Sequence, residues 1–89
     1  MDIKFIGWCN QANHDKVWGI GATDDNEFMT FWGRRGNKLQ TNTKSMSGYD
    51  AYKLIDSKRK KGYQEFDKNE LDKIHEDFRK QVFVVQLKG

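Results

Sequence analysis

The chain has 89 residues, no proline and a net charge of +3, and this length supports one modest hydrophobic core but not two. The longest apolar run, Val82 to Val85, is far shorter than the roughly 20 residues of a membrane span, and no basic-then-apolar leader opens the chain. One cysteine and two histidines exclude an internal disulfide and a four-ligand zinc site. We therefore expect one domain over residues 1–89 that is cytoplasmic or otherwise intracellular, with no cofactor, no metal and no membrane partner.

The net charge hides an asymmetry along the sequence. Residues 34–61 hold nine Lys or Arg against two acidic residues, a net +7, whereas residues 1–33 carry −3 and residues 62–89 carry −1. Such a segment is either a well-solvated surface or the footprint of an anionic polymer, and its concentration in 28 residues favours the second interpretation.

Three strands are predicted in the first third of the chain, over Ile3–Cys9, Val17–Gly21 and Glu27–Trp32. A polar loop over residues 10–15 and a turn over residues 23–26 separate them. In the third strand, alternation places Phe28, Thr30 and Trp32 on one face and Met29 and Phe31 on the other. The pattern predicts an antiparallel meander.

A fourth strand is predicted over Leu39–Lys44, after a tight turn at residues 35–38 whose Gly36-Asn37 pair tolerates positive φ. Its threonines favour a strand, but both of its faces are polar. Such a strand suits either a sheet edge or a face in contact with a ligand, and the edge is the simpler interpretation.

A helix is predicted over Tyr49–Lys61, with Ser47 as its N-cap and Gly62 as a left-handed C-terminal cap. Its buried face would hold Ala51, Tyr52 and Ile55. The Lys58-Arg59-Lys60-Lys61 run at its end is explained by the helix dipole alone, or it contacts nucleic acid as well.

A second amphipathic helix is expected from Asp67 to about Gln81, followed by an apolar, β-branched final strand over Val82–Leu87. The predicted fold class is thus α+β: a small antiparallel sheet of about four to five strands packed by one helix, with a second C-terminal helix and a final strand.

Chemistry that would mark an enzyme is missing from the sequence. Cys9 lies in a predicted strand as a small buried hydrophobe, His14 beside Asp15 is an isolated polar pair, and His75 shares a helix face with apolar residues. The glycines match neither the dinucleotide fingerprint nor the P-loop. We expect no enzymatic activity, no catalytic residues and no small-molecule substrate.

Basic residues beside an aromatic side chain are what nucleic-acid binding requires, because cations replace phosphate counterions while the aromatic ring stacks on a base or sugar. No helix carries Asn, Gln and Arg spaced for reading base edges, so recognition of shape or ends is favoured over sequence readout. The candidate nucleic-acid-binding residues are Trp32, Arg34, Arg35, Lys38, Lys44, Lys58, Arg59, Lys60 and Lys61.

The chain resembles the WGR domain family through Trp32-Gly33-Arg34, a following polar strand, a helix with Ala51 and Ile55 on one face, and the ending Lys60-Lys61-Gly62-Tyr63. The resemblance covers roughly residues 3–66 and leaves residues 67–89 as an extension. It implies an antiparallel sheet packed by one helix and, as in poly(ADP-ribose) polymerases, binding near a DNA strand break. There the motif Trp packs on the sugar at a 5′ end and the motif Arg contacts DNA and neighbouring domains, roles that would fall to Trp32 and Arg34.

The 89 residues depart from that context, because a catalytic domain and zinc fingers are not among them and the 24–26 loop is acidic. Direct DNA contact or self-association would have to replace an interdomain role for Arg34. Our hypothesis is a non-catalytic module that binds DNA, or RNA, through phosphates, with ends or nicks as candidate targets.

The alternative is an interaction or adaptor module that docks a protein partner through the Trp32 surface or a sheet edge. An inhibitor of a nucleic-acid enzyme, acting through the same basic residues, is a third possibility. Trp32, at the end of a half-buried strand, is either exposed to a ligand or part of the core.

Overall fold

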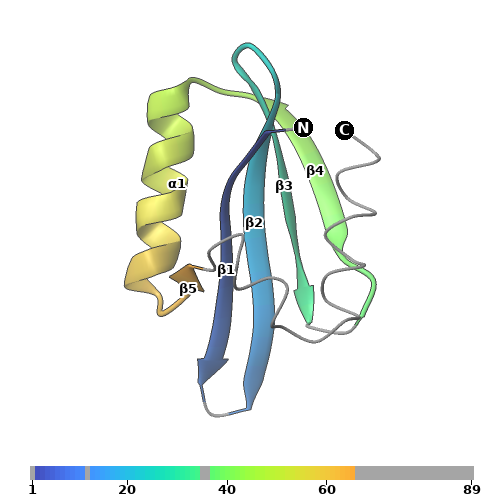
Figure 1. Cartoon of the computed structure of the whole chain (residues 1–89), viewed down its shortest axis with the longest axis vertical. Coiled ribbons are helices and arrows are strands. Elements are labelled where there is room, and N and C mark those ends of the chain that lie inside the picture. The colour runs from blue at the N-terminus through green and yellow to red at the C-terminus, as the bar shows by residue number, and fades with distance from the viewer. Residues whose placement is uncertain (1, 12, 35–36, 66–89) are drawn as a thin grey trace.

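The computed structural model describes residues 2–11, 13–34 and 37–65. They form a five-stranded antiparallel sheet in the order β4-β3-β2-β1-β5 with one helix, α1, packed on it (Figure 1). The α+β class with a small antiparallel sheet and one helix is confirmed. The C-terminal helix and strand predicted beyond residue 66 lie outside the described residues.

Strands β1 (Asp2–Gln11) and β2 (His14–Asp24) form a long hairpin that stays paired up to Gln11 opposite His14. The prediction of a polar loop over residues 10–15 was therefore wrong. The backbones of Asn10 and Asp15 continue the ladder, because strand pairing uses main-chain groups and tolerates polar side chains.

Strand β3 (Glu27–Arg34) follows a tight turn in which Asn26 adopts a positive φ of 55°. Among the described residues, strand β4 (Gln40–Ser45) pairs only with β3 and forms an edge of the sheet, as predicted. A hydrogen bond from the Asn37 N–H to the Arg34 carbonyl (3.1 Å) closes a turn where the chain reverses between β3 and β4.

Helix α1 (Gly48–Lys60) begins at Ser47, whose hydroxyl accepts a hydrogen bond from the Asp50 N–H at 3.1 Å, so the predicted N-cap is confirmed. Ala51 and Ile55 are buried against the sheet. Tyr52 was predicted on this face, but it is 57% exposed. The buried stripe is narrower than the predicted one because it follows the i, i+4 spacing of Ala51 and Ile55.

The core lies on both faces of the sheet. Towards α1, Phe5, Trp18, Ile20 and Phe28 pack around Ala51 and Ile55. On the opposite face the buried residues are Ile6, Val17, Met29 and Phe31. Cross-strand register puts Trp32 opposite Trp18 and Phe31 opposite Gly19, so the predicted alternation along β3 is confirmed.

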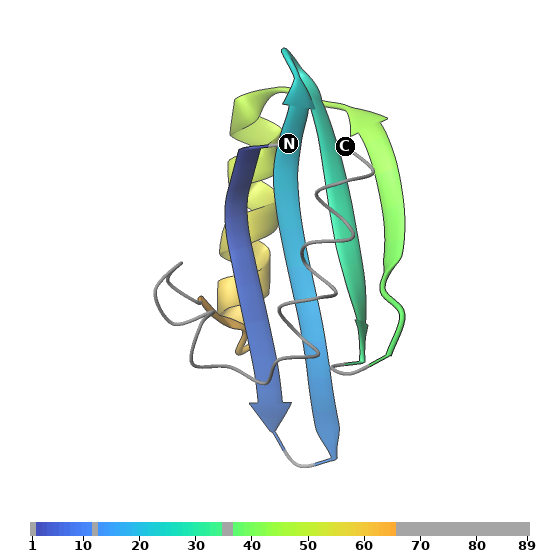
Figure 2. The same ribbon diagram turned by 45° about the vertical axis from the view of Figure 1, so that its right-hand side comes forward.

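Charges are segregated between the two ends of the sheet. Figures 1 and 2 show that the β2–β3 turn and the start of α1 lie at one end, whereas the end of β3 and the last turn of α1 lie at the other. We call the first the acidic end, where Asp2, Asp24, Asp25, Glu27 and Asp50 outnumber Lys4 and Lys44. We call the second the basic end, where Lys16, Arg34, Lys38, Lys58, Arg59, Lys60 and Lys61 outnumber Asp15, Asp56 and Glu65.

Candidate nucleic-acid interface

The basic end contains a groove of about 420 Å³ between the start of β2, the end of β3 and the last turn of α1. We call it the basic-end groove. Its lining combines aromatic rings, cationic side chains and a few neutral polar groups: Asn13, His14, Asp15, Lys16, Val17, Trp18, Trp32, Gly33, Arg34, Lys58 and Tyr63.

Two tryptophans from neighbouring strands form part of this groove. Trp18 and Trp32 are direct cross-strand partners on the α1 face of the sheet. Trp18 is only 6% exposed, and its ring centroid lies 5.9 Å from that of Phe5. Trp32 is partly buried and packs against the same cluster. Trp32 thus extends the core and also lines the groove, and its contact with a ligand stays a prediction.

Gly33 separates Trp32 from Arg34 and has a φ of 153°, a backbone conformation that residues with side chains rarely adopt. A Cβ at this position would also come within 3.2 Å of the Leu39 side chain, which is buried. Backbone conformation therefore favours glycine in the middle of the Trp-Gly-Arg sequence, and packing leaves little room for a side chain there.

Two cations face each other across the last pair of the β2–β3 ladder. Lys16 lies directly opposite Arg34, and both residues are exposed. Among the described residues, neither forms an ion pair. Like charges directly opposite one another destabilise a sheet, so this pair holds unneutralised positive charge beside the two tryptophans.

Lys58 supplies a third cation from α1. Its Nζ lies 5.4 Å from the ring centroid of Trp18 and 5.8 Å from that of Tyr63, within the range of cation–π attraction. Partial burial, and secondarily the nearby Lys61 charge, lower the pKa of Lys58 below its ordinary value. Its ammonium group is therefore partly shielded from water and lies close to a second positive charge.

The end of α1 places Lys58 and Tyr63 side by side. The Tyr63 N–H donates to the Lys58 carbonyl and the Gly62 N–H donates to the Arg59 carbonyl, each at 3.1 Å, which is the Schellman pattern of helix termination. Gly62 has a φ of 101°, so its predicted role as a left-handed cap is confirmed. Burial, together with Cys9, raises the pKa of Tyr63 above its ordinary value of 10.0.

One carboxylate also lines the groove. Asp15 accepts a hydrogen bond from the indole nitrogen of Trp8 at 2.6 Å. Val17 faces away from α1, and Asp15, two residues before it on the same strand, faces the same way. Trp8 is the cross-strand partner of Val17 and shares that face. The Asp15 charge is therefore directed away from the face that carries Lys58 and the tryptophan pair.

The structure places the predicted candidates in different parts of the molecule. Trp32, Arg34 and Lys58 line the groove, while Lys38, Arg59, Lys60 and Lys61 lie near it at the basic end. Lys44 pairs with Phe28 near the opposite end of the sheet and does not join them. Arg35 lies outside the described residues.

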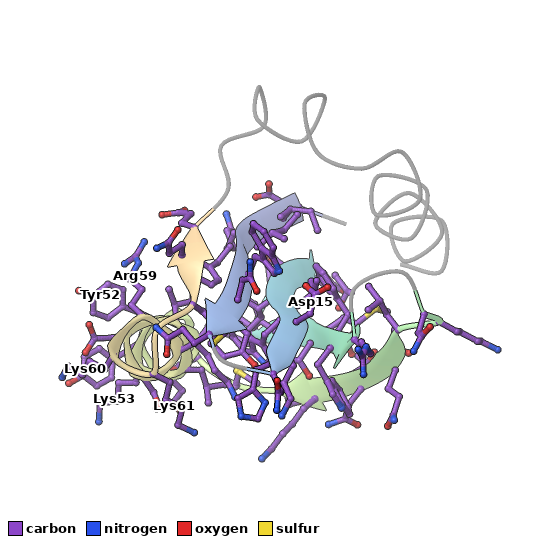
Figure 3. All side chains as sticks on the ribbon, turned by 90° about the horizontal axis from the view of Figure 1, so that it is seen from below. Asp15, Tyr52, Lys53, Arg59, Lys60 and Lys61 are labelled. Atoms are coloured by element: carbon purple, nitrogen blue, oxygen red, sulfur yellow. The ribbon has the colours of Figure 1, made fainter. Side chains whose placement is uncertain are left out.

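Two of the basic-end candidates are held by acidic neighbours. Arg59 bonds Glu65 of β5 (Gln64–Glu65) at 2.9 Å, and Lys60 bonds Asp56 at 3.0 Å. Figure 3, which looks onto the basic end, shows Lys53, Lys60 and Lys61 pointing outwards from α1 and Arg59 directed towards the side where β5 lies. Exposed pairs of this kind contribute little to stability, and both cations remain on the surface.

Sequence reasoning missed Lys16, Trp18 and Tyr63 as parts of the site. A partial signal for the first two was present, because a tight turn at residues 25–26 brings β2 back beside β3. Equal distances from that turn would set Trp18 opposite Gly33, however, and a register shift between Ala22 and Asp24 instead sets Trp18 opposite Trp32 and Lys16 opposite Arg34. No comparable signal exists for Tyr63, which reaches the groove only through the Schellman turn.

In the described part of the chain, no three His, Cys, Asp or Glu residues are arranged to hold a metal ion. No helix within residues 2–65 that the structure describes is long and apolar enough to cross a membrane. No family model matches the chain, and searches of curated proteins and of solved structures found no match either.

Proposed function

We propose that this protein is a non-catalytic module that binds nucleic acid through its basic end. The observation that carries the proposal is the Lys16–Arg34 pair. A sheet that places two cations opposite each other, without an acidic partner in the described residues, gives up stability. Binding of a polyanion would relieve the repulsion between the two cations, because each phosphate neutralises a positive charge that the fold leaves uncompensated.

The surroundings of the pair support a nucleic acid over other polyanions. Trp18, Trp32 and Tyr63 line the same groove, and aromatic faces next to cations suit bases and sugars as well as phosphates. The resemblance to WGR domains agrees with this choice, and we propose membership of that family together with a preference for DNA ends or nicks.

The proposal is tested by binding to a 5′-phosphorylated nicked duplex and to an intact closed plasmid across a salt series. If about four to six phosphates are engaged, log K falls with log salt with a slope of about −4 to −5. Arg34→Gln should reduce the magnitude of this slope by about 0.9, the value of one phosphate contact. Lys44→Gln, which removes the same charge at the acidic end, should leave it unchanged.

Affinity that does not change with salt would contradict the proposal. Equal effects of the two substitutions would contradict the assignment to the basic end. Tighter binding to the nicked duplex than to the intact plasmid would support end or nick recognition.

A second candidate function is docking of a protein partner. The outer face of α1 favours it, because Tyr49 and Tyr52 are 66% and 57% exposed and tyrosine is enriched at the hot spots of interfaces. Absence of binding to both DNA forms would favour this alternative.

A further inference from the structure

We infer that the basic-end groove accommodates one unpaired nucleotide, so that the preferred ligand is a duplex end bearing a single-stranded overhang. This inference rests on the proposed function and specifies its ligand. It combines Trp32 and Arg34 of the Trp-Gly-Arg sequence with three residues outside it, Trp18, Lys58 and Tyr63.

The size of the groove is the first argument. At about 420 Å³ it falls near the lower limit of pockets that enclose small molecules, roughly 300–1,000 Å³. A groove of this size can hold a single nucleotide but not a base pair with its two backbones. The groove is therefore suited to one flat group and its phosphate.

The shape of the basic end is the second argument. The last β2–β3 pair is Lys16 with Arg34, but β2 begins at His14 and pairs there with Gln11. The β1–β2 hairpin therefore extends beyond the end of β3, as Figure 1 shows. A blunt duplex end would meet this projecting hairpin before it reached the tryptophans, whereas an unpaired nucleotide could enter beside it.

The chemistry of the lining is the third argument. Trp32 and Tyr63 are partly exposed rings, and their faces can stack on any base without reading its sequence. Lys58 is held over Trp18 and Tyr63, next to the position that a stacked base would take. Lys58 and Arg34 can then neutralise the nucleotide's phosphate, while Asn13 and His14 at the groove offer hydrogen-bonding groups to its base edge.

The test uses a DNA hairpin whose loop is a glycol linker, so that it contains no unpaired base. Three versions of this hairpin are compared: one with a blunt open end, one whose open end carries a single unpaired thymidine, and one that carries a single abasic residue with the same phosphate. Each overhang is placed on the 5′ strand and, separately, on the 3′ strand. We expect the thymidine overhang of one polarity to bind at least about 5-fold tighter than its abasic counterpart, the minimum that one base stacked on an aromatic ring contributes.

Two substitutions show which aromatic ring causes the preference for thymidine over the abasic residue. Trp32→Leu should reduce the thymidine-to-abasic ratio to nearly one. Tyr52→Leu is the matched control, because Tyr52 is an exposed aromatic on the outer face of α1. Circular dichroism checks that Trp32→Leu folds, and the comparison of the three DNAs on the wild-type protein does not depend on any variant.

Equal affinity of the wild type for all three ends, with a steep salt dependence, would overturn this inference and leave the proposed function standing. Loss of the ratio in Tyr52→Leu but not in Trp32→Leu would also overturn it, because the base would then stack on α1. Absence of binding to every hairpin at low salt would count against the proposed function itself.

Discussion

Gly62 is the residue on which the geometry of the groove depends most. Its φ of 101° ends α1 and turns Tyr63 back beside Lys58. A Cβ there would lie 2.7 Å from the amide nitrogen of the Gln11 side chain. That side-chain amide can move, so the backbone conformation is the larger obstacle to substitution.

We predict that Gly62→Ala lowers the free energy of unfolding by about 1–2 kcal/mol, because a left-handed conformation costs a residue with a side chain about this much. Gly48→Ala is the control. A Cβ at Gly48, in the first turn of α1, meets no atom within 4 Å, and alanine there should be neutral or stabilising. Urea denaturation measures both, and equal effects would contradict the cap assignment.

Tyr63 gives a prediction about alkaline pH. Its pKa is raised by burial, and secondarily by Cys9, so the folded state favours the neutral phenol more than the unfolded state does. The resulting stability is complete below about pH 10 and is lost as the pH rises through the raised pKa.

We therefore expect the Tm of the wild type to fall above pH 10 more steeply than that of Tyr63→Phe, which has no phenol to ionise at this position. Thermal melts between pH 8 and 11 measure this difference. Tyr49→Phe, at a tyrosine that is 66% exposed, should follow the wild type. An equally steep fall in Tyr63→Phe would show that another group causes the alkaline loss.

Among the elements, the end of the β2–β3 ladder is where we expect the proposed binding surface to lower the stability of the fold. Lys16 and Arg34 repel each other there, and cross-strand pairs contribute about 0.2–1 kcal/mol. Lys16→Gln should therefore raise the free energy of unfolding by about this amount at low salt while weakening nucleic-acid binding.

At about 1 M salt, where the screening length falls to about 3 Å, the stability gain of Lys16→Gln should nearly vanish. Urea denaturation at the two ionic strengths measures it, with Lys44→Gln as a control opposite the apolar Phe28. A destabilised Lys16→Gln protein at low salt would contradict the repulsion.

The elements also show how much of the structure was predictable. Alternation in β3, the Ser47 cap and the Gly62 cap follow from local rules, and each was confirmed. Local rules failed at the polar end of the β1–β2 hairpin, where the composition predicted a loop but main-chain pairing extends the strands. They also failed for β5, whose two polar residues, Gln64 and Glu65, have no strand pattern and pair with Gly7 and Trp8 through a tertiary contact.

The candidate site was predictable only in part, for a related reason. Charge counting along the sequence located Arg34 and Lys58, but it also included Lys44, which the antiparallel return of β4 carries to the acidic end. Lys16 lies in the acidic first third of the sequence and joins the site through strand register alone. Position in the sheet, and not position in the sequence, therefore determines which cations act together.

At the scale of the molecule, the described residues separate an acidic end from a basic end. If the protein binds a polyanion as we propose, this charge distribution should orient it so that the basic end approaches first. Contacts with nucleic acid should therefore be confined to one end of the sheet, whatever the length of the ligand.

The most direct test of this central claim is an NMR titration of the protein with duplex DNA that follows its backbone amides and the three tryptophan indoles. We predict that the largest shifts occur at Lys16, Trp18, Trp32, Arg34 and Lys58, including the indoles of Trp18 and Trp32. The amides of Asp24, Asp25 and Lys44 at the acidic end should remain unchanged. Shifts concentrated at the acidic end, or at Tyr49 and Tyr52 on the outer face of α1, would contradict the assignment of the binding surface to the basic end.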